Sequence, residues 1–119
     1  MPGAILIVDD EPGIADALAM VLSDEGHTVR TASHGAEAAA LLSREPVDLV
    51  VSDVMMPMVD GVTLVRQLRG RGDNTPVVLM SAAPHRVREL PGVRLVSKPF
   101  DLDAILEVVA CALDPIGNE

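Results

Sequence analysis

Residues 49–57 have the sequence LVVSDVMMP, and they indicate the fold class more clearly than any other part of the chain. Three apolar residues in a row, with no polar face, are typical of a strand buried on both sides in a parallel sheet. The strand ends at one carboxylate, Asp53. Ligands of open α/β sheets bind beyond the carboxyl ends of the strands, so we expect chemistry at Asp53. Asp also favours the first position of a turn, and on this stretch alone the two interpretations are equally good.

Short apolar runs alternate with amphipathic stretches along the rest of the chain. Strands are predicted at residues 4–8, 49–53, 76–80 and 93–97, with a more exposed strand at 28–32. Helices are predicted between Pro12 and Gly26, from about Gly35 to Ser43, from Asp60 or Gly61 onward, and after Asp101. Strands that alternate with helices form right-handed βαβ units, so we predict one α/β domain over residues 1–119 with a mostly parallel sheet.

Two local signals refine the helix predictions. Ser33 has a residue type that caps helix N-termini, and we expect it to cap the helix that begins at about Gly35. Between Ser81 and Lys98, Pro84 and Pro91 leave room for barely two helical turns. The fourth helix is therefore predicted to be shortened or irregular.

Composition limits the classes of function. The chain has 119 residues, 49% of them hydrophobic, which is enough for one globular core. A formal net charge of −9 and a single aromatic residue, Phe100, argue against direct nucleic-acid binding, as does the lack of a further domain after the last helix. No apolar run approaches the roughly 20 residues that cross a bilayer, so no membrane association is expected. Cys111 is the only cysteine, so we expect a cytoplasmic location and a thiol packed among Val108, Val109 and Leu113.

Polar side chains follow four of the predicted strands. Asp9 and Asp10 follow the first strand, Asp53 ends the third, Ser81 the fourth, and Lys98 follows the fifth. The carboxyl ends of parallel strands lie on one edge of a sheet, so these side chains are expected to converge. Three carboxylates without a counterion would repel by about 4 kcal/mol per pair at roughly 4 Å and an effective dielectric near 20. A divalent cation would relieve this repulsion, and an all-oxygen site indicates Mg²⁺.

Several short motifs together resemble the receiver domain of bacterial two-component response regulators. They are Val8-Asp9-Asp10-Glu11, Asp53 followed by Pro57 and Gly61, Ser81-Ala82, and Lys98-Pro99-Phe100. The resemblance extends from Ile5 to the last predicted helix. It implies a flavodoxin-like (βα)5 fold, a three-layer sandwich whose parallel strands have the order 2-1-3-4-5.

The resemblance also implies a phospho-acceptor site. Asp53 would take a phosphoryl group from a phosphohistidine on a sensor histidine kinase or a histidine phosphotransfer protein. Lys98 would contact Asp53 before the reaction and a phosphoryl oxygen afterwards, and the Ser81 hydroxyl would bond another phosphoryl oxygen. In-line phosphoryl transfer depends on positioning and charge neutralisation, which such a set of groups supplies. The chain would not be an enzyme beyond its own phosphorylation and slow dephosphorylation, and a conformational change would pass the signal to a downstream protein effector.

The same resemblance implies how a metal ion would be held. Asp10 and Asp53 would bind Mg²⁺ directly, and the backbone carbonyl of Met55 would be a third protein ligand. Asp9 would act through a water molecule. Mn²⁺ could substitute for Mg²⁺. The ion would neutralise charge as the phosphoryl group is transferred.

Two features depart from the family pattern. Most receiver domains have an aromatic residue three positions before the lysine, where this chain has Leu95. The interval between Ser81 and Lys98 is also a few residues shorter than usual. None of the site residues is affected, so we expect the chemistry to be preserved and the output surface to differ.

Two other functions are compatible with an acidic cluster on such a sheet. One is a receiver-like docking module that no longer depends on phosphorylation; the complete set of site residues argues against it. The other is a Mg²⁺-dependent phosphatase with an aspartyl-phosphate intermediate. Such an enzyme usually has a second Asp two positions after the nucleophile, where this chain has Met55.

Overall fold

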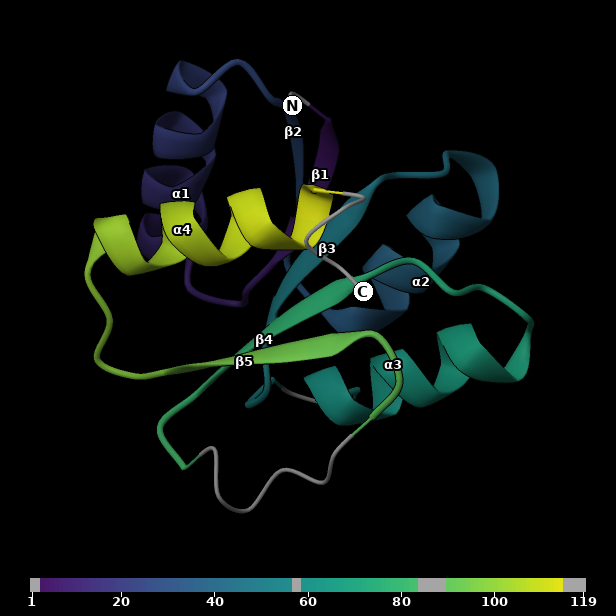
Figure 1. Cartoon of the computed structure of the whole chain (residues 1–119). Coiled ribbons are helices and arrows are strands. Elements are labelled where there is room, and N and C mark those ends of the chain that lie inside the picture. The colour runs from purple at the N-terminus through teal and green to yellow at the C-terminus, as the bar shows by residue number, and fades with distance from the viewer. Residues whose placement is uncertain (1–2, 57–58, 84–89, 115–119) are drawn as a thin grey trace.

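A computed structural model describes residues 3–56, 59–83 and 90–114, and they form one parallel sheet with helices on both faces (Figure 1). The strands are β1 (Ala4–Val8), β2 (Thr28–Ala32), β3 (Leu49–Asp53), β4 (Val77–Ser81) and β5 (Val93–Ser97). Their order across the sheet is β2-β1-β3-β4-β5, and every neighbouring pair is parallel. The predicted fold class and strand order are confirmed.

Four helices complete the described part of the chain. They are α1 (Pro12–Asp24), α2 (Gly35–Arg44), α3 (Gly61–Gly70) and α4 (Leu102–Leu113). In Figure 1, α1 and α4 cover one face of the sheet, and α2 and α3 cover the other. The segment for which a shortened fourth helix was predicted includes residues 84–89, which lie outside the described residues. None of the four helices is long and apolar enough to cross a membrane.

The central strands are apolar throughout because each face of the sheet is covered. Leu49 and Val51 pack into the core on the α1 and α4 side, whereas Val50 packs into the core on the α2 and α3 side. All three are fully buried. Burying one such side chain stabilises the fold by about 1.5–3 kcal/mol, so the alternation in β3 ties both helical layers to the strand that ends at Asp53.

The register of the sheet aligns the ends of the strands. Asp53 pairs with Met80 across β3 and β4, and Ser81 pairs with Ser97 across β4 and β5. Beyond the last pair, the Lys98 N–H donates to the Ser81 carbonyl at 2.8 Å. Between the ends of β1 and β2, the Asp9 N–H donates to the Ala32 carbonyl at 3.1 Å. Residues that are far apart in the sequence therefore leave the sheet at one level.

The cap of α2 differs from the prediction by one residue. His34 Nδ1 accepts the Glu37 N–H at 3.2 Å, so His34 and not Ser33 is the N-cap. The Ser33 hydroxyl is engaged elsewhere, because it lies 3.4 Å from the Glu37 carboxylate. The Asp60 and Asp101 side chains cap α3 and α4 by accepting N–H groups of the first helical turn, at the positions where the sequence predicted these helices to start.

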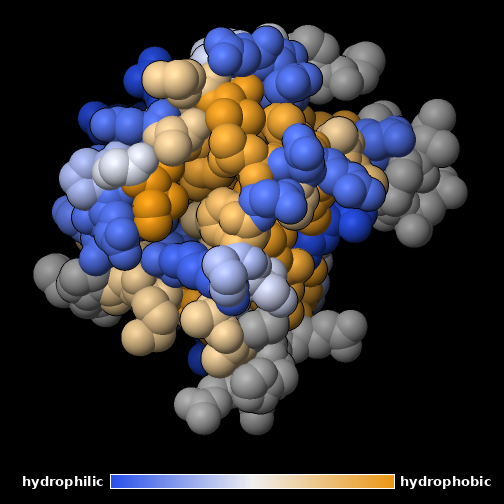
Figure 2. Space-filling model, turned by 90° about the vertical axis from the view of Figure 1, so that its left-hand side faces the viewer, coloured by the Kyte–Doolittle hydropathy of each residue, from blue (hydrophilic) through white to orange (hydrophobic). Residues whose placement is uncertain are grey.

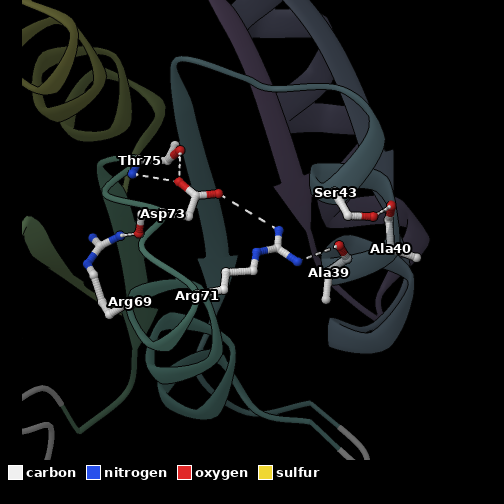
Figure 3. A network of polar contacts seen from close by, with 7 residues as sticks. All are labelled: Ala39, Ala40, Ser43, Arg69, Arg71, Asp73 and Thr75. Carbon is white, nitrogen blue, oxygen red and sulfur yellow. Dashed lines mark hydrogen bonds and ion pairs between the residues drawn. The ribbon is translucent and has the colours of Figure 1, made fainter.

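A polar network at the end of α3 joins this helix to α2 and to the segment before β4 (Figure 3). The Arg71 guanidinium donates to the Ala39 carbonyl of α2 at 3.4 Å and lies 3.8 Å from the Asp73 carboxylate. That carboxylate accepts the Thr75 N–H at 2.9 Å, and Arg69 donates to the Asp73 carbonyl at 2.9 Å. Burial acts to raise the pKa of Asp73, but the Thr75 hydrogen bonds and the two arginine charges lower it overall.

The expectation of a packed Cys111 thiol is wrong, because Cys111 is exposed on α4. The buried face of α4 is formed by Ile105, Val109 and Ala112. Cys111 comes two residues after Val109, which places it about 200° around a helix of 3.6 residues per turn. Val109 and Ala112 therefore face the sheet, while the Cys111 thiol points away from it.

Candidate functional site

The carboxyl-end edge of the sheet collects the residues that the sequence singled out. Carboxylate oxygens of Asp9, Asp10 and Asp53 all lie within 4.8 Å of one another. Asp9, Asp53 and Ser81 are buried, and Asp10 is exposed. Lys98 comes from the loop after β5 and reaches Asp53 with its ammonium group. The fold therefore brings together residues from four strand ends.

Asp53 has a different partner for each of its carboxylate oxygens. Oδ2 lies 3.0 Å from Lys98 Nζ, and Oδ1 accepts the Met55 N–H at 3.3 Å. The side chain of Asp53 is only 5% exposed and that of Lys98 is 23% exposed. Ion pairs of this kind form short, charge-assisted hydrogen bonds, and removing one partner leaves a buried charge uncompensated. The pair therefore fixes the position of the Asp53 carboxylate at the end of β3.

Asp9 is buried in an unfavourable environment for its charge. Its Oδ1 accepts the Glu11 N–H at 2.9 Å, but its Oδ2 is buried and has no hydrogen-bond partner among the described residues. Burial raises the pKa of the Asp9 carboxyl; the Glu11 hydrogen bond and Lys98 oppose this rise, whereas the charges of Asp53 and Asp10 add to it. A buried polar atom without a partner is destabilising, and such atoms in proteins often meet water or an ion.

These residues fit a divalent cation. Three carboxylates meet within 4.8 Å, and the buried oxygen of Asp9 has no other partner among the described residues. Met55 is the second residue after β3, and its N–H donates to Asp53 Oδ1, so its backbone lies beside the cluster. Carboxylate, carbonyl and water oxygens are the ligands of Mg²⁺ and Mn²⁺ in proteins.

Ser81 lies at the end of β4, between the strands that carry Asp53 and Lys98. Its hydroxyl oxygen accepts the Ala83 N–H at 3.0 Å, which orients the side chain. Because a hydroxyl has one proton to donate and two lone pairs, this contact leaves the Ser81 proton available to an anionic oxygen.

Gly61 brings α3 close to Asp53. A Cβ atom at Gly61 would lie 2.6 Å from the Asp53 carbonyl oxygen and 2.9 Å from the Leu79 side chain, so only glycine fits there. The Gly61 N–H also donates to the Val54 carbonyl at 2.9 Å. The loop between β3 and α3 is thereby closed at its base, next to Asp53.

The sequence did not indicate an apolar groove that borders the site. Its volume is about 610 Å³, and its lining includes Ile14 and Ala17 of α1, Phe100 and Leu102 at the start of α4, and Lys98. Figure 2 shows hydrophobic residues gathered at the centre of this face, with hydrophilic residues around them. The groove forms because α1 and the segment before α4 approach each other, which no local sequence pattern reports.

A model of the response regulator receiver domain matches residues 5–110 of the chain. The chain belongs to this family. The receiver domain is 37% identical over 118 residues to the transcriptional regulatory protein GlrR of Escherichia coli (strain K12), a match that covers 95% of this chain and 27% of that protein. It is also 37% identical over 111 residues to the response regulator MprA of Mycobacterium sp. (strain KMS), covering 89% of this chain and 48% of that protein. The chain thus spans less than half the length of these relatives.

Solved structures agree with this assignment. The chemotaxis response regulator CheY4 of Vibrio cholerae superposes on the receiver domain with a TM-score of 0.86 at 27% identity, covering 95% of this chain and all (100%) of that one. The receiver domain of the hybrid histidine kinase CckA gives a TM-score of 0.78 at 34% identity, covering 94% of this chain and 100% of that one.

Leu95, where most receiver domains have an aromatic residue, is 39% exposed on β5. It pairs with Leu79, whose side chain belongs to the core on the α2 and α3 side. Leu95 therefore lies on the side of the sheet opposite the apolar groove.

We predict that Asp9→Asn raises the melting temperature of the metal-free domain at pH 7. A carboxyl whose pKa is raised in the folded state stabilises the fold below its ordinary pKa of 3.8 and loses this contribution as the pH rises through the raised value. Asn cannot ionise, so the variant avoids this loss. Thermal unfolding followed by circular dichroism in EDTA should show a gain of about 4 °C, equivalent to about 1 kcal/mol.

The gain in melting temperature of Asp9→Asn over wild type should shrink as the pH falls toward 4, because the wild-type Asp9 carboxyl then takes up its proton. The exposed Asp16 of α1 provides the matched control, because Asp16→Asn makes the same chemical change outside the cluster. A lower melting temperature for Asp9→Asn at pH 7 would contradict the proposed environment of Asp9.

Proposed function

We propose that this receiver domain takes a phosphoryl group onto Asp53 from a phosphohistidine of a sensor histidine kinase or a histidine phosphotransfer protein. The observation that carries the proposal is the buried Asp53 carboxylate, 3.0 Å from Lys98 and within an acidic cluster at the edge of the sheet. Family membership supports it, since receiver domains are signalling modules. We further propose that the reaction takes place in the cytoplasm.

In the proposed reaction, an Asp53 oxygen attacks phosphorus in line with the phosphorus–nitrogen bond of the phosphohistidine. The new phosphorus–oxygen bond forms as the phosphorus–nitrogen bond breaks, and the imidazole keeps the electron pair and takes up a proton. Lys98 moves from the Asp53 carboxylate to a phosphoryl oxygen, and the Ser81 hydroxyl donates to another. Fixed donors at developing charge are the main source of catalysis in phosphoryl transfer.

We propose that Asp10, Asp53 and the backbone carbonyl of Met55 hold Mg²⁺, with Asp9 acting through water. When bound, the ion supplies positive charge that offsets the three carboxylates and the incoming phosphoryl group. The buried Asp9 oxygen, which has no hydrogen-bond partner in the described part of the chain, supports this assignment. Mn²⁺ has similar ligand preferences and could take the same place.

We propose that the apolar groove receives the protein that donates the phosphoryl group. The groove includes Lys98 and Ala82 in its lining, so it is continuous with the acceptor site. A donor that covers the groove would place its phosphohistidine at Asp53 and exclude water during transfer. After transfer, a conformational change would act on a downstream protein effector, because the named relatives are longer regulatory proteins.

Asp10→Asn should weaken Mg²⁺ binding by at least roughly tenfold, or about 1.4 kcal/mol, because it removes a proposed ligand. Isothermal titration measures the affinity, and the formation of a beryllofluoride or acetyl-phosphate adduct at Asp53 measures the chemistry. Asp24→Asn, at the far end of α1, is the control and should behave as wild type. Equal Mg²⁺ affinity in wild type and Asp10→Asn would remove the proposed metal site, and wild type that forms no adduct would indicate phosphorylation-independent docking.

The phosphorylated domain should lose its phosphoryl group slowly. Hydrolysis needs a water molecule held in line with the Asp53–phosphorus bond. In receiver domains, the residues two positions after the phospho-acceptor and two positions after the serine commonly flank this water, and here they are Met55 and Ala83. Met55 is 76% exposed, and neither side chain offers a strong hydrogen-bonding group to orient that water. The double substitution Met55→Asn with Ala83→Glu should therefore increase the rate of phosphate release by roughly tenfold or more. An unchanged or lower rate in the double variant would count against this account.

Leu102→Gln should slow phosphorylation by a histidine kinase that phosphorylates the wild type, without slowing phosphorylation by acetyl phosphate. Leu102 lines the groove and is 43% exposed in the free domain. A bound donor protein would bury this side chain, and losing that contact should raise the receiver concentration at which the kinase reaction is half-saturated by roughly tenfold. Leu95→Gln, at a similarly exposed leucine outside the groove, is the matched control. If both variants slow the kinase reaction equally, the groove is not the docking site.

A further inference from the structure

Val59, two residues before α3 begins, packs very close to Gly35, the first residue of α2. A Cβ atom at Gly35 would lie 2.6 Å from Val59 Cγ1, 2.7 Å from Val59 Cβ and 2.8 Å from the Val59 carbonyl oxygen. Carbon atoms pack best at about 3.5–4.0 Å, so any larger residue at position 35 would push Val59 away by about 1 Å. The backbone of Gly35 is not among those with positive φ, so the requirement at this position is for space.

The α2 side of this contact is held firmly. His34 Nδ1 accepts the Glu37 N–H at 3.2 Å, and the Ser33 N–H donates to the Glu37 carboxylate at 3.3 Å. Just before them, the Ala32 carbonyl accepts the Asp9 N–H at 3.1 Å. The start of α2 is therefore tied to the edge of the sheet, and a clash at Gly35 would be relieved mainly by movement of Val59.

The loop side of the contact leads directly to the acceptor site. Val59 precedes Asp60, which caps α3 by accepting the Thr63 N–H at 2.7 Å. The next residue, Gly61, donates its N–H to the Val54 carbonyl, which closes the loop at its base. Displacement of Val59 would thus be transmitted through Asp60 and Gly61 to Val54, the residue before Met55.

We infer that Gly35 is a positioning residue for the backbone of Val54 and Met55, which carries the proposed third metal ligand. This inference rests on the proposed metal site. Gly35 contributes no side chain to the cluster, and it would act through Val59, whose atoms are the nearest to a Cβ at position 35. A metal ligand on a loop is effective only where neighbouring groups hold it in place, and loss of such outer contacts typically lowers metal affinity 10–100-fold.

The central test is Gly35→Ala, with Gly70→Ala as the matched control. Both substitutions add one methyl group to a helix, but a Cβ at Gly70 meets nothing within 4 Å. In the metal-free domain, Gly35→Ala should shift the backbone amide resonances of Met55 and Val59, whereas Gly70→Ala should leave them in place. Isothermal titration should show Mg²⁺ affinity lowered roughly tenfold by Gly35→Ala and unchanged by Gly70→Ala.

A second substitution separates positioning from a general loss of stability. Adding Val59→Gly to Gly35→Ala removes two of the three close atoms, so Mg²⁺ affinity should recover in part. A lower melting temperature for Gly35→Ala with unchanged Met55 resonance and unchanged affinity would overturn the inference. So would an affinity that the second substitution does not improve.

If Gly35→Ala does not fold, Val59→Ala tests the same contact from the loop side with α2 intact. It should weaken Mg²⁺ binding and shift the Met55 amide, and wild-type values for both would overturn the inference. Failure of the wild type to bind Mg²⁺ would instead reject the proposed metal site. The Met55 resonance in the metal-free protein would still report whether Gly35 positions the loop.

Discussion

The ion pair between Lys98 and Asp53 is the interaction on which the rest of the site depends. Asp53 ends β3 and Lys98 follows β5, with β4 between these strands, so their 3.0 Å contact requires the register of three strands. The pair is largely buried, so either charge alone would be strongly unfavourable. The contact between Lys98 and Asp53 therefore depends both on the register of the sheet and on the packing of the core.

The same edge also concentrates negative charge that the protein does not neutralise by itself. Lys98 is one cation against three carboxylates, and one oxygen of Asp9 is buried without a partner among the described residues. The apolar layers on both faces of the sheet hold these groups together despite their repulsion. Because the excess charge is negative, a site built in this way favours a bound cation over an empty state.

The loops of the receiver domain are positioned by contacts with helices as well as by the strands that precede them. Gly61 lets α3 approach the backbone of Asp53, and Gly35 lets α2 approach Val59. On the other face, α1 and the start of α4 leave the apolar groove beside Lys98. The helical layers therefore connect the acceptor site with two surfaces, one on each side of the sheet.

The sequence by itself determined the fold class, the strand order through its family resemblance, and the residues at the strand ends. Burial on two faces produces continuous apolar runs, which are a local pattern that shows where the strands lie. Since parallel strands end on one edge of a sheet, the residues that follow these runs could be assigned to one site. Only the tertiary structure decided that His34 caps α2, that Cys111 is exposed, that a groove borders Lys98, and that Gly35 meets Val59. The groove and the contact of Gly35 depend on how closely segments far apart in the sequence approach, which no local pattern encodes. The cap and the exposed thiol depend on the residue at which α2 starts and on the face of α4 that meets the sheet.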